Sequence, residues 1–331
     1  PLPPEVVRRV LDAELGELVH TQFQSISDEP LAAASIGCTH RATLSDGTPV
    51  IVKVQRPGVE ELVERDGRVL RWSARQLEAR SAGARSLGLL ALADELVDGV
   101  TAELDFTSEA QHNAQLRTNR AGDPGIGIPE VFPDLTTQRV LTMEWVDGRS
   151  VAERAAVEAA PVPDDELADR LLHSFLGQVL RNGVYHADPH PGNVLIDSAG
   201  TLWLIDYGAV GTLDPITLEA LQLMAIAYST RDPAMLARAV RRMIGPVGED
   251  LDMTSLEFDL GSVLGTVETT GFGPDAVHGV LRVLQRHEIP APRSLTILGR
   301  SMITLEGTLR TIDPDFQMGP RAQSMLKEAA G

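Results

Sequence analysis

The chain has 331 residues, enough to bury a large core and to fold as two lobes. Its formal net charge of −18 argues against a nucleic acid as its partner. The single cysteine, Cys38, excludes an internal disulfide and fits a reducing compartment, and no signal peptide or apolar run of the roughly 18 to 20 residues that span a membrane is recognisable, so we expect a cytoplasmic location.

A helix and a hairpin are predicted first. Apolar residues at helical spacing predict a helix over 4–18. The small-residue segment 31–37, LAAASIG, follows, and two strands are expected over 39–44 and 49–54. Asp46-Gly47 between these strands is a strong signal for a tight turn.

The second strand of this hairpin carries one of only two lysines among 29 basic residues. Lys53 lies on the apolar strand VIVKV, whereas Lys327 lies near the C-terminus. A compact ammonium suits a site that approaches phosphate oxygens, and Arg does not replace it there. V-x-V-K-V is typical of the V-A-I-K strand whose lysine pairs the nucleotide phosphates. Chance survival of one lysine in an Arg-rich chain is the alternative, and the position of Lys53 argues against it.

Long helices and a loop are expected next. Hydrophobic periodicity predicts helices over 59–80 and 87–119. Gly and Pro make 121–129 a loop. The apolar segment 140–146 predicts a strand that leads into a connector at Asp147-Gly148.

The second half is predicted to be mostly helical. Leu167, Leu171, Phe175 and Val179 stand four apart on one helix face, and Gly183 is a good terminator. This predicted helix is followed by the motif HADPHPGN at 186–193, which carries the strongest functional signal in the chain.

Three polar side chains have the spacing of a kinase active site. Asp188 and Asn193 are five apart, as in the catalytic loop H-R-D-x-x-x-x-N, and Asp206 opens Asp-Tyr-Gly, a variant of Asp-Phe-Gly. Strands predicted over 194–196 and 202–205 connect the two motifs. Phosphoryl transfer needs Mg²⁺ and a carboxylate that orients the nucleophile and accepts its proton. Asn193 and Asp206 supply the hard oxygen ligands that Mg²⁺ takes, and Asp188 is the candidate base.

Two other interpretations compete for this stretch. His186 and His190, four apart, would share Zn²⁺ if they lay on a helix, but Pro189 and Pro191 disfavour a helix here. A polar turn between strands would explain Asp-Pro alone, but not three ligands at this spacing around a hairpin.

The whole pattern resembles the UbiB-type atypical kinases, the family that includes the mitochondrial coenzyme-Q kinases. The segments that carry the resemblance are LAAASIG at 31–37, IVKVQRPGVEE at 51–61, ELDFTSEAQHN at 103–113 and HADPHPGN at 186–193 with Asp206. The family's N-terminal K-x-G-Q segment does not occur among these residues, and Tyr207 stands where Phe is usual.

The resemblance implies an α+β, protein-kinase-like fold of two lobes. An N-terminal helix and linker would occupy 1–30. The N-lobe, with an antiparallel sheet, the alanine-rich loop and a helical insertion, would occupy 31–146. A mainly helical C-lobe with the catalytic loop and the metal-binding Asp would occupy 147–331.

The resemblance also implies a nucleotide site. The alanine-rich loop would cover the nucleotide with Leu31, Ala32, Ala33, Ala34, Ser35, Ile36 and Gly37. Lys53 would contact the phosphates, with Glu109 as its helix partner. Glu144 and Val146 would meet the adenine from the hinge at 143–146. Glu103, Asp105 and Glu109 are expected on one long helix, with Asp105 and Glu109 on a shared face; a solvated acidic face is the alternative.

The function implied by the resemblance is that of an atypical kinase or ATPase that binds ATP or ADP with Mg²⁺. Its expected place is in isoprenoid quinone or other lipid metabolism, with a lipid-like or quinone-precursor molecule as partner and peripheral association with a membrane surface left open. A small-molecule phosphotransferase of the aminoglycoside or choline-kinase type would explain HADPHPGN but not the alanine-rich loop. A nucleotide-responsive binding module with little turnover is the third alternative.

Overall fold

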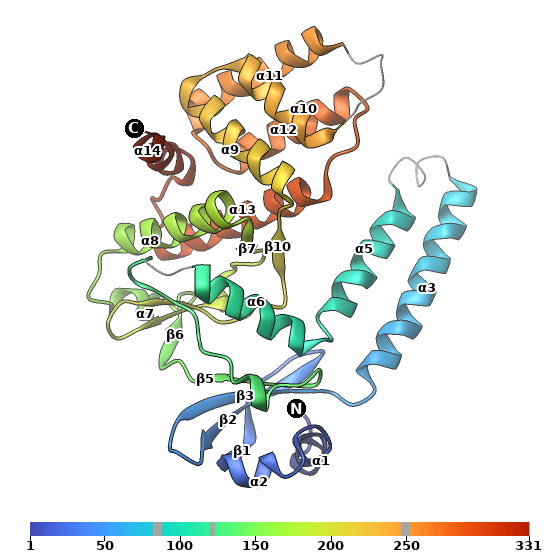
Figure 1. Cartoon of the computed structure of the whole chain (residues 1–331), viewed down its shortest axis with the longest axis vertical. Coiled ribbons are helices and arrows are strands. Elements are labelled where there is room, and N and C mark those ends of the chain that lie inside the picture. The colour runs from blue at the N-terminus through green and yellow to red at the C-terminus, as the bar shows by residue number, and fades with distance from the viewer. Residues whose placement is uncertain (82–87, 120–122, 246–251, 331) are drawn as a thin grey trace. The chain divides into compact units, whose positions relative to one another are not determined.

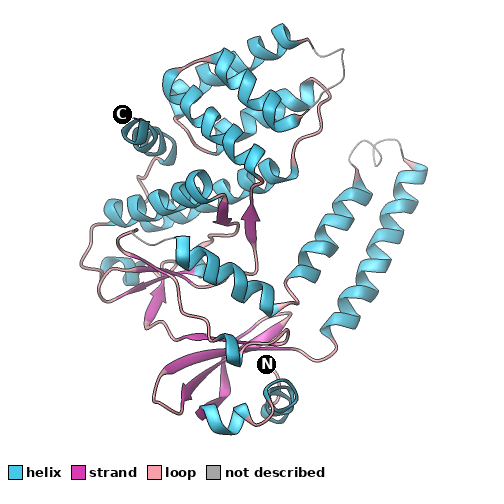
Figure 2. Ribbon diagram, in the orientation of Figure 1, coloured by secondary structure: helices cyan, strands magenta, loops and turns pink. Residues whose placement is uncertain are grey.

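The structure, a computed structural model, describes residues 1–81, 88–119, 123–245 and 252–330 (Figure 1). The chain divides into two compact units. The first is formed by Pro1–Ala114 and Pro129–Trp145, and the second by Gln115–Ile128 and Val146–Gly331. The first contains an antiparallel sheet with helices and the second is mainly helical (Figure 2), so the predicted α+β class is confirmed.

The first unit is built on a four-stranded antiparallel sheet of order β1-β2-β3-β5. Its elements are α1 (Pro4–Leu15), α2 (Leu18–Gln22), β1 (Phe23–Ala33), β2 (Gly37–Leu44), β3 (Pro49–Gln55), α3 (Val59–Arg80), α5 (Leu89–Ala102), α6 (Phe106–Asn119, which belongs to this unit as far as Ala114) and β5 (Val140–Glu144). The predicted hairpin is confirmed, because β2 and β3 pair around Asp46-Gly47.

The two faces of this sheet are covered by different helices. Val50, Val52 and Val54 of β3 are fully buried in a core cluster to which α1 also contributes, and each such burial is worth about 1.5–3 kcal/mol. Because side chains alternate along a strand, Ile51 and Lys53 point to the opposite face, where Phe106 of α6 packs in a smaller cluster.

The helical insertion is a pair of helices, α3 and α5, that pack side by side (Figure 1). Gly67 lets the two helices pack closely, because a Cβ atom there would lie 2.7 Å from a methyl carbon of Val97.

The second unit contains two small sheets and a helical core. Its elements are β4 (Ile126–Gly127), β6 (Gly148–Ser150), α7 (Arg154–Glu158), α8 (Asp164–Gly177), β7 (Val184–His186), β8 (Val194–Asp197), β9 (Leu202–Leu204), β10 (Val210–Thr212), α9 (Pro215–Thr230), α10 (Pro233–Ile244), α11 (Met253–Thr270), α12 (Pro274–Arg286), α13 (Arg293–Ile312) and α14 (Met318–Ala330). The strands form one sheet of order β4-β9-β8-β6 and a β7-β10 pair. None of the helices described is long and apolar enough to cross a membrane.

Several predicted boundaries were wrong. The first helix ends at Leu15, because Gly16 adopts a φ of 54°. The helix expected over 87–119 is two helices, with a break between Ala102 and Phe106. The predicted loop over 121–129 includes the short strand β4. Residue 87 and residues 121–122 lie outside the described residues.

Candidate active site

Lys53 and Glu109 form a buried ion pair in the first unit. Lys53 Nζ donates to Glu109 Oε1 at 2.6 Å, and the two side chains are 17% and 7% exposed. β3 turns the lysine toward the face that α6 covers, and Glu109 lies in the first turn of α6. The predicted pairing is therefore present. Burying either charge without the other would cost stability, so each residue holds the other in place.

The start of α6 depends on Asp105. Its Oδ1 accepts from the backbone N–H of Thr107 at 2.9 Å and from the Thr107 hydroxyl at 2.6 Å. These bonds are the main reason why the pKa of Asp105 lies below its usual value. Asp105 is thus the N-cap of the helix that carries Glu109. The expectation that Glu103, Asp105 and Glu109 lie on one helix is wrong, because α5 ends before Glu103 and α6 begins after Asp105.

The alanine-rich segment is mostly strand. Leu31, Ala32 and Ala33 belong to β1, and Ala33 pairs with Cys38 of β2. Only Ala34, Ser35 and Ile36 form the connecting turn, which Ala34 N–H closes by donating to Gly37 O at 2.8 Å. The segment expected to be a loop is therefore a hairpin with a short tip.

Gly37 and Arg56 fix this hairpin tip. A Cβ atom at Gly37 would lie 2.4 Å from Val54 O, so only glycine fits. The Arg56 guanidinium donates to Ser35 O at 3.3 Å and to Ala34 O at 3.2 Å, and its backbone N–H donates to Ile36 O at 2.7 Å. Sequence reasoning missed Arg56. Its place three residues after Lys53, in the basic turn of IVKVQRPG, was the signal available.

Cys38 follows the hairpin tip and is buried. Its Sγ lies 3.1 Å from His40 Nε2, and His40 Nδ1 lies 2.8 Å from Ser27 O. Burial raises the pKa of the Cys38 thiol. Cys38 is a small core residue at the start of β2, held in its neutral form.

The predicted hinge falls at the border of the two units, which lies between Trp145 and Val146. Glu144 ends β5. Its backbone N–H donates to Glu130 O at 2.8 Å, and its side-chain Oε2 accepts from Glu130 N–H at 3.0 Å. Arg41 stacks on the Trp145 ring at 4.7 Å. Val146 is buried.

In the second unit, β7 leads directly into the predicted catalytic loop. Asp188 N–H donates to His186 Nδ1 at 3.2 Å, and Asn193 Nδ2 donates to Asp188 O at 3.2 Å. Burial of His186 lowers its pKa to about 4, so the ring is neutral at neutral pH and its proton lies on Nε2. His190 Nδ1 likewise accepts a loop N–H, that of Gly192, at 3.0 Å. Both histidines therefore shape the loop, and no helix brings them together as the zinc interpretation requires.

The hairpin β8–β9 brings Asn193 and Asp206 to the same end. Val194 pairs with Leu204 in the antiparallel register. Ile205 N–H donates to Asn193 O at 3.1 Å. Because Asp206 is the next residue after Ile205, it lies at the same end of the hairpin as Asn193. At the closed end, Asp197 accepts from the backbone N–H groups of Ala199 and Thr201 and from the Trp203 indole, each at 2.9 Å.

Asn193 and Asp206 fit a bound Mg²⁺ by their donor chemistry. Because Asn193 Nδ2 is engaged with Asp188 O, Oδ1 is the amide atom available as an acceptor. Asp206 Oδ1 is oriented by Gly208 N–H at 3.0 Å. Amide and carboxylate oxygens are the ligands that Mg²⁺ prefers. Tyr207, which stands where Phe is usual, is fully buried. Its hydroxyl donates to Leu204 O, so the extra oxygen is satisfied within the hairpin.

A π turn over Gln178–Asn182 holds the start of the loop, and sequence reasoning missed it. Gln178 Oε1 accepts from His186 N–H at 3.0 Å, and its Nε2 donates to Ser174 Oγ at 3.3 Å, with all three residues buried. Gly183 ends the turn with a φ of 66°, as its predicted role as terminator requires. π turns often occur at functional sites.

Comparison with known proteins agrees with this arrangement. The ABC1 atypical kinase-like domain matches residues 1–240, and the UbiB helical domain matches residues 275–317. An uncharacterised protein of Synechocystis is 33% identical over 93% of this chain and 78% of its own length. The probable protein kinase UbiB of Marinobacter nauticus is 31% identical over 99% of this chain, which spans 61% of that protein.

Longer and structurally known relatives extend the comparison. The chloroplastic protein Activity of BC1 Complex Kinase 1 of Arabidopsis thaliana is 30% identical over 96% of this chain, which spans about half (47%) of that protein. The solved structure of the Rv3197–erythromycin complex from Mycobacterium tuberculosis matches with a TM-score of 0.68 and 25% identity, over 95% of this chain and 80% of the other. The chain therefore belongs to the ABC1 atypical kinase-like family, with a UbiB helical domain after its kinase-like domain.

Proposed function

We propose that this protein binds ATP with Mg²⁺ and acts as an atypical kinase or ATPase. The observation that carries the proposal is the Lys53–Glu109 ion pair, with an Nζ–Oε1 distance of 2.6 Å between two largely buried side chains. A lysine and a glutamate brought from a strand and a helix into a buried pair are the arrangement that kinases use to hold a nucleotide phosphate. Glu109 fixes the position of the Lys53 ammonium group, which keeps its positive charge.

The second unit supplies the remaining chemistry in this proposal. Asn193 and Asp206 would hold Mg²⁺, which when bound neutralises charge on the phosphates. Asp188 orients the nucleophile and accepts its proton. The hydrogen bonds from Asp188 N–H to His186 and from Asn193 Nδ2 to Asp188 O hold the loop around this carboxylate. The hairpin tip at Ala34–Ile36 and residues Glu144 and Val146 complete the proposed nucleotide contacts.

We also propose a role in isoprenoid quinone or other lipid metabolism, with a lipid-like or quinone-precursor molecule as partner. This part rests on family membership and on the name of the Marinobacter relative, UbiB. Peripheral association with a membrane surface belongs to the same proposal.

The test is steady-state ADP release by wild type, Lys53→Met and Asp206→Asn, with and without Mg²⁺ and with and without lipid vesicles. We expect Mg²⁺-dependent turnover that lipid stimulates and that both substitutions abolish, whereas Lys327→Arg, a change of an exposed residue of α14, behaves as wild type. Mg²⁺-dependent binding without turnover would instead identify a nucleotide-responsive binding module. Absence of any nucleotide binding by the wild type would overturn the proposal.

A further inference from the structure

Helix α13 of the UbiB helical domain passes through the core of the second unit beside the catalytic loop. Its buried face is otherwise apolar, with Leu298, Met302, Leu305 and Leu309 in the main core cluster. The same face carries two hydroxyls, those of Ser301 and Thr308, and both residues are fully buried.

Both hydroxyls reach the backbone of the loop that carries Asp188. Ser301 Oγ donates to Ala187 O at 2.8 Å, and Thr308 Oγ1 donates to Pro189 O at 2.6 Å. The two acceptors are the carbonyl groups of the residues immediately before and after Asp188. Residues seven apart lie on one helix face, so a single helix grips the loop on both sides of its carboxylate.

Each hydroxyl has one proton and two acceptors within reach. The alternative acceptors are helix carbonyls, Ile297 O at 2.8 Å from Ser301 and Thr304 O at 3.1 Å from Thr308. Those carbonyl groups already accept i+4 backbone N–H groups within α13. For Thr308 the loop carbonyl is also the nearer acceptor. Because the helix carbonyl groups already have backbone partners, we assign the two hydroxyl protons to the loop carbonyl groups.

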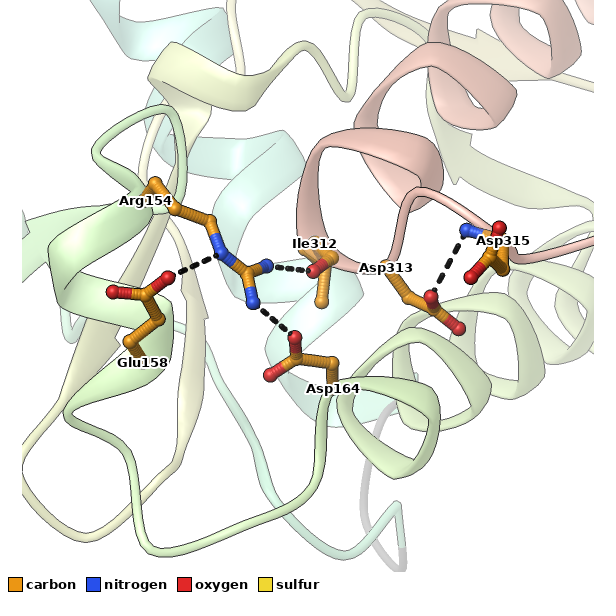
Figure 3. Close-up of polar contacts among 6 residues, drawn as sticks. All are labelled: Arg154, Glu158, Asp164, Ile312, Asp313 and Asp315. Carbon is orange, nitrogen blue, oxygen red and sulfur yellow. Dashed lines mark hydrogen bonds and ion pairs between the residues drawn. The ribbon is translucent and has the colours of Figure 1, made fainter.

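The C-terminal end of α13 is itself anchored (Figure 3). The Arg154 guanidinium donates to Ile312 O at 2.7 Å, to Asp164 Oδ2 at 2.5 Å and to Glu158 Oε1 at 3.1 Å. This arrangement satisfies a terminal helix carbonyl and ties α13 to α7 and α8. Thr308 lies one turn before this clamp, at the same end of the helix.

We propose that Ser301 and Thr308 are positioning residues that fix the orientation of Asp188 through the flanking carbonyl groups. The inference rests on the proposed function, since Asp188 must act as the base for its orientation to matter. It assigns to the UbiB helical domain the task of holding the catalytic loop of the kinase-like domain. Nucleotide binding measured without Mg²⁺ should not depend on this contact, because neither hydroxyl belongs to the proposed nucleotide contacts.

The test compares Thr308→Val, Ser301→Ala, Thr308→Ser and the matched control Thr311→Val in the full chain. Thr311 lies on the same helix, and its hydroxyl bonds Gly307 O of α13 itself at 2.9 Å. We expect Thr308→Val and Ser301→Ala to lower kcat by about 10- to 100-fold, with the nucleotide Kd measured without Mg²⁺ unchanged. Thr308→Ser should restore kcat, and Thr311→Val should match wild type.

Hydrogen exchange of the peptide over 186–193, followed by mass spectrometry, gives a readout that needs no turnover. We expect Thr308→Val and Ser301→Ala to lose protection there, while protection in the rest of α13 stays at the wild-type level. Wild-type protection of the loop in both variants would overturn the inference, as would wild-type kcat in both. An inactive wild type would defeat the proposed function, and the exchange result would still decide whether α13 holds the loop. If Thr308→Val fails to fold, Ser301→Ala and Thr308→Ser decide on the same readouts.

Discussion

Lys53 Nζ and Glu109 Oε1 lie 2.6 Å apart, although the two residues are 56 positions apart in the chain. One comes from a strand and the other from a helix, and each side chain is less than one fifth exposed. The pair makes the lysine a fixed charge rather than a mobile surface group, and the first two predictions depend on that.

Lys53→Arg should behave as a loss of function. The guanidinium is wider and planar, and its charge is less concentrated, so it should fit poorly between Glu109 and a phosphate group. Steady-state ATP turnover and nucleotide affinity are the measurements, and Lys327→Arg is the control because that side chain is exposed. Full activity in Lys53→Arg would show that this strand does not serve the nucleotide.

Lys53→Met and Glu109→Gln should be strongly non-additive. Each single variant removes one charge of a buried ion pair, which costs about 3–5 kcal/mol of stability, and turnover should fall in both. The double variant should be little worse than either single variant, because residues in contact couple. A double-mutant cycle on turnover, with circular dichroism to confirm folding, measures the coupling. Simple additivity would contradict a functional pair.

Asp206→Asn should abolish the Mg²⁺-dependent part of ATP affinity while the fold persists. The substitution would remove the charged ligand of the proposed metal site and keep the shape of the side chain. Titration of nucleotide binding with and without Mg²⁺ measures the effect. If the two titration curves differ in the variant as much as they do in wild type, Asp206 is not a metal ligand.

Asp188→Asn should lower turnover far more than nucleotide affinity. In the proposed function the carboxylate aligns the nucleophile and accepts its proton, a role worth about 10²–10⁴-fold in rate. The amide can keep the loop geometry but cannot accept the proton. Measurement of kcat beside the nucleotide Kd separates the two effects. ATP hydrolysis at the wild-type rate would remove Asp188 from the catalytic role.

Asp105→Ala should destabilise the first unit by about 1 kcal/mol at neutral pH, because it removes the N-cap of α6. The lowered pKa of Asp105, caused chiefly by the Thr107 side-chain hydrogen bond, makes this contribution pH-dependent. It is present in full above the ordinary carboxyl pKa and is lost as the pH falls through the lower value of the folded state.

Thermal unfolding of wild type and Asp105→Ala from pH 7 to pH 3 tests this pH dependence. The difference in Tm should shrink at the acid end. Asp105→Asn keeps a capping oxygen and should lie close to wild type at neutral pH. A constant difference between wild type and Asp105→Ala across the pH range would show that the charge plays no part.

The parts that could be predicted from sequence share a cause. Asp46-Gly47 between alternating strands is a local signal, and the structure has the hairpin there. A lysine retained in an Arg-dominated chain points to chemistry that arginine cannot perform, and the structure pairs it with Glu109. The spacing of Asp188, Asn193 and Asp206 around a short hairpin depends only on local register, so their arrangement followed from the motif.

The features that could not be predicted from the sequence depend on competing local signals or on contacts between distant residues. Helical periodicity continues across 103–105, and it concealed that Asp105 caps a new helix, although Asp is a preferred N-cap residue. Ser301 and Thr308 bond loop residues that precede them by 114 and 119 positions in the chain. No window of sequence contains both partners, and a hydroxyl on a helix gives no sign of whether it faces solvent or a loop.

The π turn at Gln178–Asn182 makes the distance between α8 and the catalytic loop sensitive to a single residue. Deleting one residue there would move every following residue back by one position relative to α8. Along β7, a shift of one place exchanges the two faces of the strand. Tyr185, whose ring packs edge-on against Phe175 at 5.9 Å, would then change places with His186. Relatives should therefore tolerate insertions and deletions elsewhere in the helical half, but should keep this junction at constant length.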